Sequence, residues 1–171
     1  MDKKFDVKKL IKISLLIAIE VILTRFCSIQ TPVVRIGFGF LPIAIIAMMY
    51  GPLSAGISYV IGDFLGMALF PSGPYFPGFT LTAFLTGIAF GVFLYKKPKT
   101  WTRIIGAVLT VCLVLNLGLD TYWLSIIMGQ GYLALLPTRI MKAVLMIPIQ
   151  SVIIGIIWKK VVVKFLKVSH A

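Results

Sequence analysis

The chain has 171 residues, of which 60% are hydrophobic and only 13% are charged, and its mean hydropathy is +1.04. A soluble globular domain is about 45–50% apolar and about 25% charged, so this composition excludes a water-soluble fold and indicates an integral membrane protein. Because one membrane span needs about 20 residues, the chain has room for five or six spans in a single domain, residues 1–171.

The net charge of +12 arises mainly from three basic clusters that flank apolar runs. Such clusters are typical of the cytoplasmic ends and loops of membrane proteins. No basic groove with interleaved aromatic residues is evident, so we expect no nucleic-acid partner. The clusters contain 13 of the 17 Lys and Arg residues: Lys3, Lys4, Lys8, Lys9, Lys12, Lys96, Lys97, Lys99, Arg103, Lys159, Lys160, Lys164 and Lys167.

The first predicted helix runs from about Lys8 to Thr24. Ser14 and Ala18 in this helix have the small-xxx-small spacing that lets a second helix approach closely. Glu20 lies about 200° from Ala18 around the helix axis. One face is therefore predicted to dock a partner while the acid points into the bundle.

A polar loop is predicted from Arg25 to about Gly37, followed by a short helix from about Phe38 to Tyr50. The third helix is predicted from about Leu53 to Phe70. Tyr59 and Asp63 share one face of it because they are four residues apart.

The segment Pro71–Gly78 contains three prolines and two glycines and is therefore not expected to be helical. Its two aromatic residues, Tyr75 and Phe76, predict a rigid flap. The fourth helix is predicted from about Phe79 to Tyr95. Small side chains on one face of this helix indicate a packing seam: Ala83, Gly87 and Gly91.

The fifth helix is predicted from about Ile104 to Met128, and the sixth from about Leu136 to Trp158. Arg139 and Lys142 lie in the opening turns of the sixth helix. A polar and aromatic stripe is predicted on the fifth helix: Asn116, Asp120 and Trp123.

The predicted fold class is an all-α membrane protein, a bundle of six transmembrane helices with both termini in the cytoplasm. With six spans, the N-terminus, the Lys96–Arg103 loop and the C-terminus lie on the same side of the membrane. All three basic clusters then face the cytoplasm, as the positive-inside rule requires, whereas five spans would separate them.

Charged residues inside the apolar runs are the best indication of function. A carboxylate at the centre of a membrane helix costs about 2.5–3.5 kcal/mol on insertion scales, yet three lie within these runs: Glu20, Asp63 and Asp120. Four bases lie near the predicted outward ends: Arg25, Arg35, Arg139 and Lys142. The surplus of bases favours an anionic ligand, and four aromatic residues could stack on a flat ring: Tyr59, Tyr75, Phe76 and Trp123. The alternative is that the charges pair with one another and serve only to hold the bundle together.

Enzymatic functions find little support. The chain lacks a Walker A sequence and an HExxH sequence, and its two cysteines form no metal-binding spacing. We therefore expect no enzyme activity, no metal and no cofactor. A solitary proton-coupled carrier that uses the acids as proton relays is an alternative.

Several segments resemble the substrate-binding S components of energy-coupling factor (ECF) transporters, and most closely the folate-specific ones. The segments are Ile36-Gly-Phe-Gly-Phe-Leu-Pro42, Tyr50-Gly-Pro-Leu-Ser-Ala-Gly56, Gly62-Asp-Phe-Leu-Gly66, Phe76-Pro-Gly-Phe-Thr-Leu-Thr82 and Leu136-Pro-Thr-Arg-Ile-Met-Lys142. The resemblance implies a protein of the bacterial plasma membrane that captures a vitamin from outside. It further implies partners, namely a membrane coupling subunit and two cytoplasmic ATPases, and a movement in which the S component topples in the bilayer. The first-helix motif of the family is commonly Ala-xxx-Ala, and here it is Ser14-Leu-Leu-Ile-Ala18.

Folate would suit the predicted site residues. Asp63, or as second choice Asp120, would accept hydrogen bonds from the pterin ring. Three neutral residues could add hydrogen bonds, although each could equally bond its own helix: Thr80, Thr82 and Asn116. The carboxylates of the glutamate tail would be held by one or more of the bases Arg25, Arg35, Arg139 and Lys142. Another vitamin such as riboflavin remains an alternative ligand.

Overall fold

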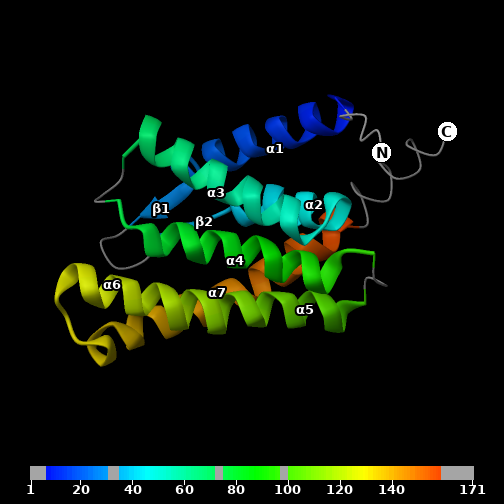
Figure 1. The fold of residues 1–171 in the computed structure, drawn as a ribbon. Helices are drawn as coiled ribbons and strands as arrows, with labels where there is room; N and C mark the ends of the chain where they lie inside the picture. Colours follow the sequence, from blue (N-terminus) through cyan, green and yellow to red (C-terminus); the bar gives the residue numbers. More distant parts are fainter. Residues whose placement is uncertain (1–6, 31–34, 72–74, 97–99, 159–171) are drawn as a thin grey trace.

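The structure, a computed structural model, describes residues 7–30, 35–71, 75–96 and 100–158. Its elements in chain order are α1 (Val7–Arg25), β1 (Ser28–Gln30), β2 (Arg35–Gly37), α2 (Phe40–Tyr50), α3 (Pro52–Leu69), α4 (Pro77–Leu94), α5 (Trp101–Leu109), the π-helical segment η1 (Thr110–Leu119), α6 (Asp120–Met128) and α7 (Tyr132–Ile157). Because α5, η1 and α6 form one continuous helix of 28 residues, the bundle has the six helices that the sequence predicts (Figure 1). The whole C-terminal basic cluster and part of the other two lie outside the described residues: Lys3, Lys4, Lys97, Lys99, Lys159, Lys160, Lys164 and Lys167.

Among the residues that the structure describes, four helices are long and apolar enough to cross a membrane: α3, α4, the continuous helix Trp101–Met128, and α7. Helix α2 has 11 residues, about 16 Å at 1.5 Å per residue, which is shorter than the hydrocarbon core of about 30 Å. Helix α1 has 19 residues but several charged side chains: Lys8, Lys9, Lys12, Glu20 and Arg25. The chain is thus a helical protein with four candidate spans and two further helices in the bundle.

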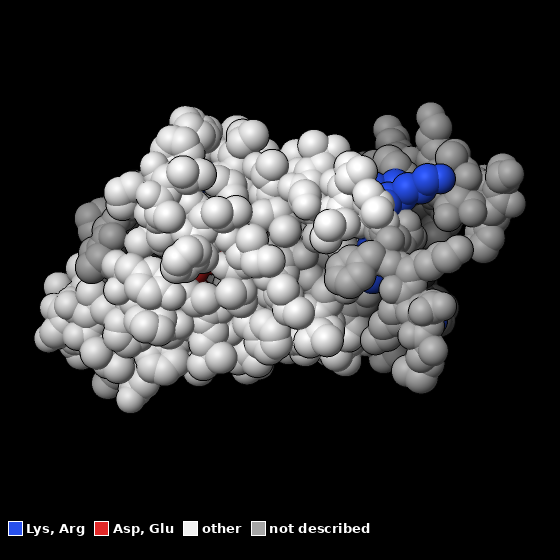
Figure 2. All heavy atoms as spheres, turned by 45° about the horizontal axis from the view of Figure 1, so that its top comes forward, with Lys and Arg blue, Asp and Glu red and all other residues white. Residues whose placement is uncertain are grey.

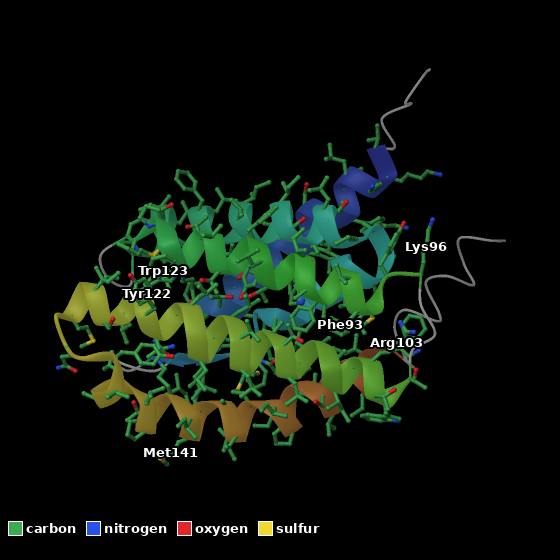
Figure 3. The ribbon with its side chains drawn as sticks, turned by 60° about the horizontal axis from the view of Figure 1, so that its bottom comes forward. Phe93, Lys96, Arg103, Tyr122, Trp123 and Met141 are labelled. Carbon is green, nitrogen blue, oxygen red and sulfur yellow. The ribbon has the colours of Figure 1, made fainter. Side chains whose placement is uncertain are left out.

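The two ends of the bundle differ in what they contain. The start of α1, the end of α4, the start of α5 and the end of α7 lie together at one end (Figure 1). Strands β1 and β2, the end of α3, the start of α4 and the α6–α7 connection lie at the other (Figure 1). Lys96 and Arg103 belong to the first end, while Tyr122 and Trp123 lie toward the second (Figure 3). The basic side chains visible in Figure 2 gather at one end, and the rest of that face is almost uncharged. We call the end with the β1–β2 hairpin the hairpin end and the opposite one the basic end.

The segment predicted as an irregular polar loop contains a short β-hairpin instead. Strands β1 and β2 pair antiparallel, with Ile29 opposite Ile36 and Gln30 opposite Arg35. The hydroxyl of Ser28 donates to the backbone oxygen of Thr24 at 2.6 Å, which ties the hairpin to the end of α1. Strands of three residues are too short to show the alternation of apolar and polar residues by which a strand is recognised.

Helix α7 begins at Tyr132, earlier than predicted. Pro137 was expected to mark its first turn but lies inside the helix, as does Pro148. Proline removes one backbone hydrogen bond inside a helix, and a membrane helix tolerates this loss where neighbouring helices pack around the freed group.

The predicted small-residue seam on α4 is confirmed, and it packs against α3. A Cβ placed on Gly87 would lie 2.5 Å from the backbone nitrogen of Gly56, and one placed on Gly91 would collide with Pro52. The two backbones are therefore in contact along this seam, the close approach that small residues allow in membranes. The apolar core lies mainly between α2, α4, α5 and η1, and its largest fully buried side chains include Phe90, Ile43, Ile46 and Val108.

Candidate ligand-binding site

Asp63 is the centre of a hydrogen-bonded group at the hairpin end. Its carboxylate oxygen Oδ2 accepts a hydrogen bond from the hydroxyl of Thr80 at 2.8 Å. The Thr80 oxygen lies 3.1 Å from the hydroxyl of Tyr75 in the segment before α4. The predicted site residues of α3, α4 and the flap are therefore brought together, and one carboxylate oxygen of Asp63 is already engaged.

A second charged group lies where α1 meets α3. Glu20 is 1% exposed, and its oxygen Oε1 accepts a hydrogen bond from the Thr24 hydroxyl at 2.7 Å. Arg25, the last residue of α1, interacts electrostatically with both Asp63 and Glu20. Glycines of α3 make room for these side chains, since a Cβ on Gly62 would collide with Glu20 and one on Gly66 would lie 2.8 Å from Nε of Arg25.

The third group is formed by α4, α6 and α7 around Asp120. Asp120 is half-buried at the start of α6 and interacts electrostatically with Lys142 and Arg139 of α7 and with Asp63 of α3. Thr82 of α4 lies beside the Asp120 side chain, and its hydroxyl donates to the backbone oxygen of Gly78 at 3.1 Å. Asp63 and Asp120, the two acids that the sequence analysis proposed as partners of the pterin ring, therefore share one polar region.

Polar atoms in this third group are buried without a protein partner. Within the described part of the chain, Oδ1 of Asp120, Nε1 of Trp123 and Nε of Arg139 are buried and have no hydrogen-bond partner. A buried polar atom without a partner costs about 1–3 kcal/mol. One acceptor and two donors in this state are available for hydrogen bonds to a ligand.

Aromatic rings adjoin these atoms. The rings of Phe76 and Trp123 lie 5.6 Å apart between centroids at an angle of 47°, and Tyr122 meets Trp123 edge to face at 5.2 Å. The backbone of Gly78 runs close beneath the first pair, because a Cβ there would lie 2.6 Å from either ring. Flat ligands bind to such surfaces by stacking.

The site occupies the half of the bundle next to the hairpin end. At about 1.5 Å per residue, Asp63 lies about 9 Å from the end of α3 and Asp120 about 12 Å from the end of α6. Arg25 lies at the very end of α1. One acidic side chain is visible in a small opening of an otherwise nearly uncharged face (Figure 2), which shows that part of the site is open to the surface.

The remaining predicted site residues have more varied surroundings. Asn116 is half-buried, and its backbone oxygen accepts the Thr121 hydroxyl at 3.5 Å. Tyr59 is half-buried and packs against the apolar core. The backbone of Arg35 is in β2, and its side chain lies outside what the structure describes.

The predicted docking pair on α1 faces away from the bundle. Ser14 and Ala18 are both exposed, whereas Glu20 is buried. The prediction that the small residues and the acid point in nearly opposite directions is therefore confirmed. The placement of Glu20 beside Arg25 was not predicted. The pair of glycines Gly62 and Gly66, placed four residues apart, was the available signal.

A metal centre has no support in this part of the chain, since the described residues contain no group of three His, Cys, Asp or Glu side chains that could hold a metal ion. The fold is that of a helical protein with four candidate membrane spans, and the polar and aromatic residues at its hairpin end form a candidate ligand site.

Comparisons with known proteins agree with this class. Residues 8–158 match the profile of the family described as "ECF transporter, substrate-specific component". The chain is 45% identical over 159 residues to the folate transporter FolT of Clostridium novyi, covering 93% of this chain and 91% of the relative. It is 31% identical over 153 residues to FolT of Leuconostoc mesenteroides, covering 86% of this chain and 82% of the relative.

A solved structure of a relative has a similar fold. The crystal structure of FolT bound with folic acid superposes with a TM-score of 0.82 at 41% identity, covering 86% of this chain and 89% of that one. The chain therefore belongs to the family of substrate-specific components of ECF transporters, and the resemblance inferred from its sequence is confirmed.

Proposed function

We propose that this protein is the folate-binding S component of an ECF importer. It captures folate outside the bacterial plasma membrane and delivers it together with a membrane coupling subunit and two cytoplasmic ATPases. The observation that carries this proposal is the 41% identity and TM-score of 0.82 to a FolT structure that contains folic acid. The unpartnered buried atoms beside Asp120 support it, because they call for a ligand with both donors and acceptors.

The pterin ring binds beside Asp120. The amino-pyrimidinone edge of a pterin offers N–H donors next to ring acceptors. Oδ1 of Asp120 can accept from that edge, while Nε1 of Trp123 and Nε of Arg139 can donate to the ring acceptors. Phe76 stacks on a face of the ring. Asp63, the first choice from sequence, already accepts a hydrogen bond from Thr80, so Asp120 is the better partner for the ring.

The glutamate tail lies nearer the hairpin end, and its carboxylates are held by Arg25. This residue lies at the end of α1, outside the ring position, and a guanidinium can hold a carboxylate through two parallel hydrogen bonds. Arg35 follows in β2 and is a second candidate for the tail. Lys142 adds positive charge near Asp120 and favours an anionic ligand over thiamine, which is cationic.

The hairpin end faces outward and the basic end faces the cytoplasm. This orientation follows from the positive-inside rule, and it makes both termini cytoplasmic if all six helices span the membrane. The exposed pair Ser14 and Ala18 offers the docking surface for the coupling subunit. Toppling of the bundle on that subunit then turns the site toward the cytoplasm.

The test is calorimetry on the protein purified in detergent or nanodiscs. The ligands are folic acid, 6-methylpterin, which lacks the tail, p-aminobenzoylglutamate, which lacks the ring, riboflavin and thiamine. We expect folic acid to bind most tightly. A protein that binds riboflavin but not folic acid would refute the assignment of the ligand.

Two arginine variants then test the placement of the ligand. Arg139→Ala is expected to weaken folic acid and 6-methylpterin by similar factors, because Arg139 contacts the ring. Arg25→Ala is expected to weaken folic acid while leaving 6-methylpterin nearly unchanged. The opposite pattern would mean that the ligand binds with its tail inward.

Reconstitution separates a partner-dependent importer from a solitary carrier. Proteoliposomes that contain this protein alone should bind folate without accumulating it. Accumulation driven by a proton gradient alone would favour the solitary carrier and would contradict the need for a coupling subunit and ATPases.

A further inference from the structure

Among the described residues, Glu20 is the one deeply buried acid that the proposed ligand contacts leave unused. It lies on α1 with 1% of its surface exposed, and the Thr24 hydroxyl donates to its Oε1 at 2.7 Å. A carboxylate in this position is costly. A bundle that merely packed α1 against α3 would use an apolar residue here, so the acid needs a specific explanation.

Glycines of two different elements surround this carboxylate. A Cβ on Gly62 of α3 would collide with Oε2 of Glu20, and a Cβ on Gly39, just before α2, would collide with Thr24 and lie 3.2 Å from Oε1 of Glu20. The side chains of α1 therefore fill space that glycine leaves on its neighbours. The C-terminal part of α1, which contains Glu20 and Thr24, therefore has one defined position against α3 and the start of α2.

Arg25, like Glu20, lies over a glycine of α3. Its guanidinium lies over Gly66, one helical turn beyond Gly62, where a Cβ would be 2.8 Å from Nε and 3.0 Å from Nη2. Arg25 interacts electrostatically with Asp63 and with Glu20. Both carboxylates are themselves fixed by hydrogen bonds, Glu20 from Thr24 and Asp63 from Thr80, so two fixed negative charges attract the guanidinium.

We propose that Glu20, with Thr24, is a positioning pair that holds Arg25 over Gly66. The selectivity of the site for a ligand with an anionic tail then depends on Glu20, which does not touch the ligand. Removing its charge releases the guanidinium from one of its two anchors. The identity of the tail rests on the proposed function, whereas the positioning of Arg25 by Glu20 does not.

The first experiment compares two ligands on Glu20→Gln, which keeps the size of the side chain. Calorimetry should show folic acid binding about tenfold more weakly, the effect of one hydrogen bond or ion contact of a charged group, with 6-methylpterin changed less than twofold. Thr24→Val should show the same selectivity to a smaller degree, and it provides the answer if Glu20→Gln fails to fold. Ser58→Ala is the matched control, because it removes a buried hydroxyl of α3 that donates to the backbone oxygen of Ser54.

The second experiment is a double-mutant cycle with Arg25→Ala. If Glu20 acts through Arg25, Glu20→Gln has no further effect on folic acid binding in the Arg25→Ala background. Equal losses for the two ligands, or losses that simply add in the cycle, would show that Glu20 only stabilises the bundle and would overturn the proposal.

A ligand-free measurement keeps the inference separate from the proposed function. If the wild-type protein does not bind folic acid, the proposed function fails, and the same cycle is measured by thermal unfolding of the ligand-free protein. Non-additive shifts of the midpoint would support the positioning of Arg25 by Glu20. Additive shifts would refute it.

Discussion

Replacing Asp120 by asparagine removes one negative charge from the proposed ring site while keeping the size of the side chain. Oδ1 of Asp120 is buried without a hydrogen-bond partner, so in the proposed complex it accepts from the pterin edge. A hydrogen bond to a charged group contributes about 1.5–3 kcal/mol, which corresponds to a factor of about 10 to 150 in affinity. We therefore expect Asp120→Asn to weaken folic acid and 6-methylpterin binding by a factor in this range.

Asp63→Asn is the matched comparison. One oxygen of Asp63 is already engaged by Thr80 at 2.8 Å, so its conversion to an amide should weaken ring binding by about fivefold or less, the value of one neutral hydrogen bond. The assay is calorimetry on both variants, with thermal unfolding of the ligand-free proteins to exclude misfolding. If Asp120→Asn binds within twofold of wild type, or if Asp63→Asn loses more, the assignment of the ring to Asp120 is wrong.

Three further predictions concern the docking surface, the ring contact and the helix seam. Ala18→Trp should leave folate binding intact but abolish uptake by cells that contain the whole importer; unchanged uptake would mean that this face of α1 does not dock. Trp123→Phe keeps an aromatic ring but loses the indole N–H, so binding should weaken about five- to tenfold, and calorimetry showing no loss would exclude that donor. Gly87→Ala should destabilise the protein by about 1–3 kcal/mol through overpacking against α3, whereas Gly131→Ala should be neutral because a Cβ there meets no atom within 4 Å. Thermal unfolding distinguishes the last two variants.

Much of the helical arrangement could be predicted, because a helix that crosses lipid needs a long run of predominantly apolar residues, which is easily recognised in a sequence. The seam of Gly87 and Gly91 was recognisable from spacing, and the structure confirms it against α3. The opposite orientation of Ala18 and Glu20 followed from helical geometry alone, since the two residues are about 200° apart around the axis. The ends of most helices were predicted within a few residues.

Three features escaped prediction, each for a physical reason. The β1–β2 hairpin has strands of three residues, which carry no periodic signal. Helix α7 begins before Pro137, because packing around a membrane helix compensates for a missing backbone hydrogen bond. The hydrogen bond from Thr80 to Asp63 joins α4 to α3, a contact that no spacing within one helix reveals.

The site itself was predicted as a set of residue types rather than as an arrangement. The sequence identified acids, bases and aromatic residues in the outward half, and the structure brings Asp63, Asp120 and Arg139 into one polar region. It also separates a group around Arg25 from a group around Asp120. That separation comes from which helices are neighbours, which a single sequence does not give.

The π-helical winding of η1 limits what can be transplanted from this protein. In a π-helix each backbone N–H pairs with the carbonyl five residues back rather than four, so one turn contains more residues than an α-helical turn. If residues 110–123 were copied onto a straight α-helix, the sequence would be the same. The angle between the Asn116 and Trp123 side chains around the helix axis would differ, because fewer residues fit into each turn.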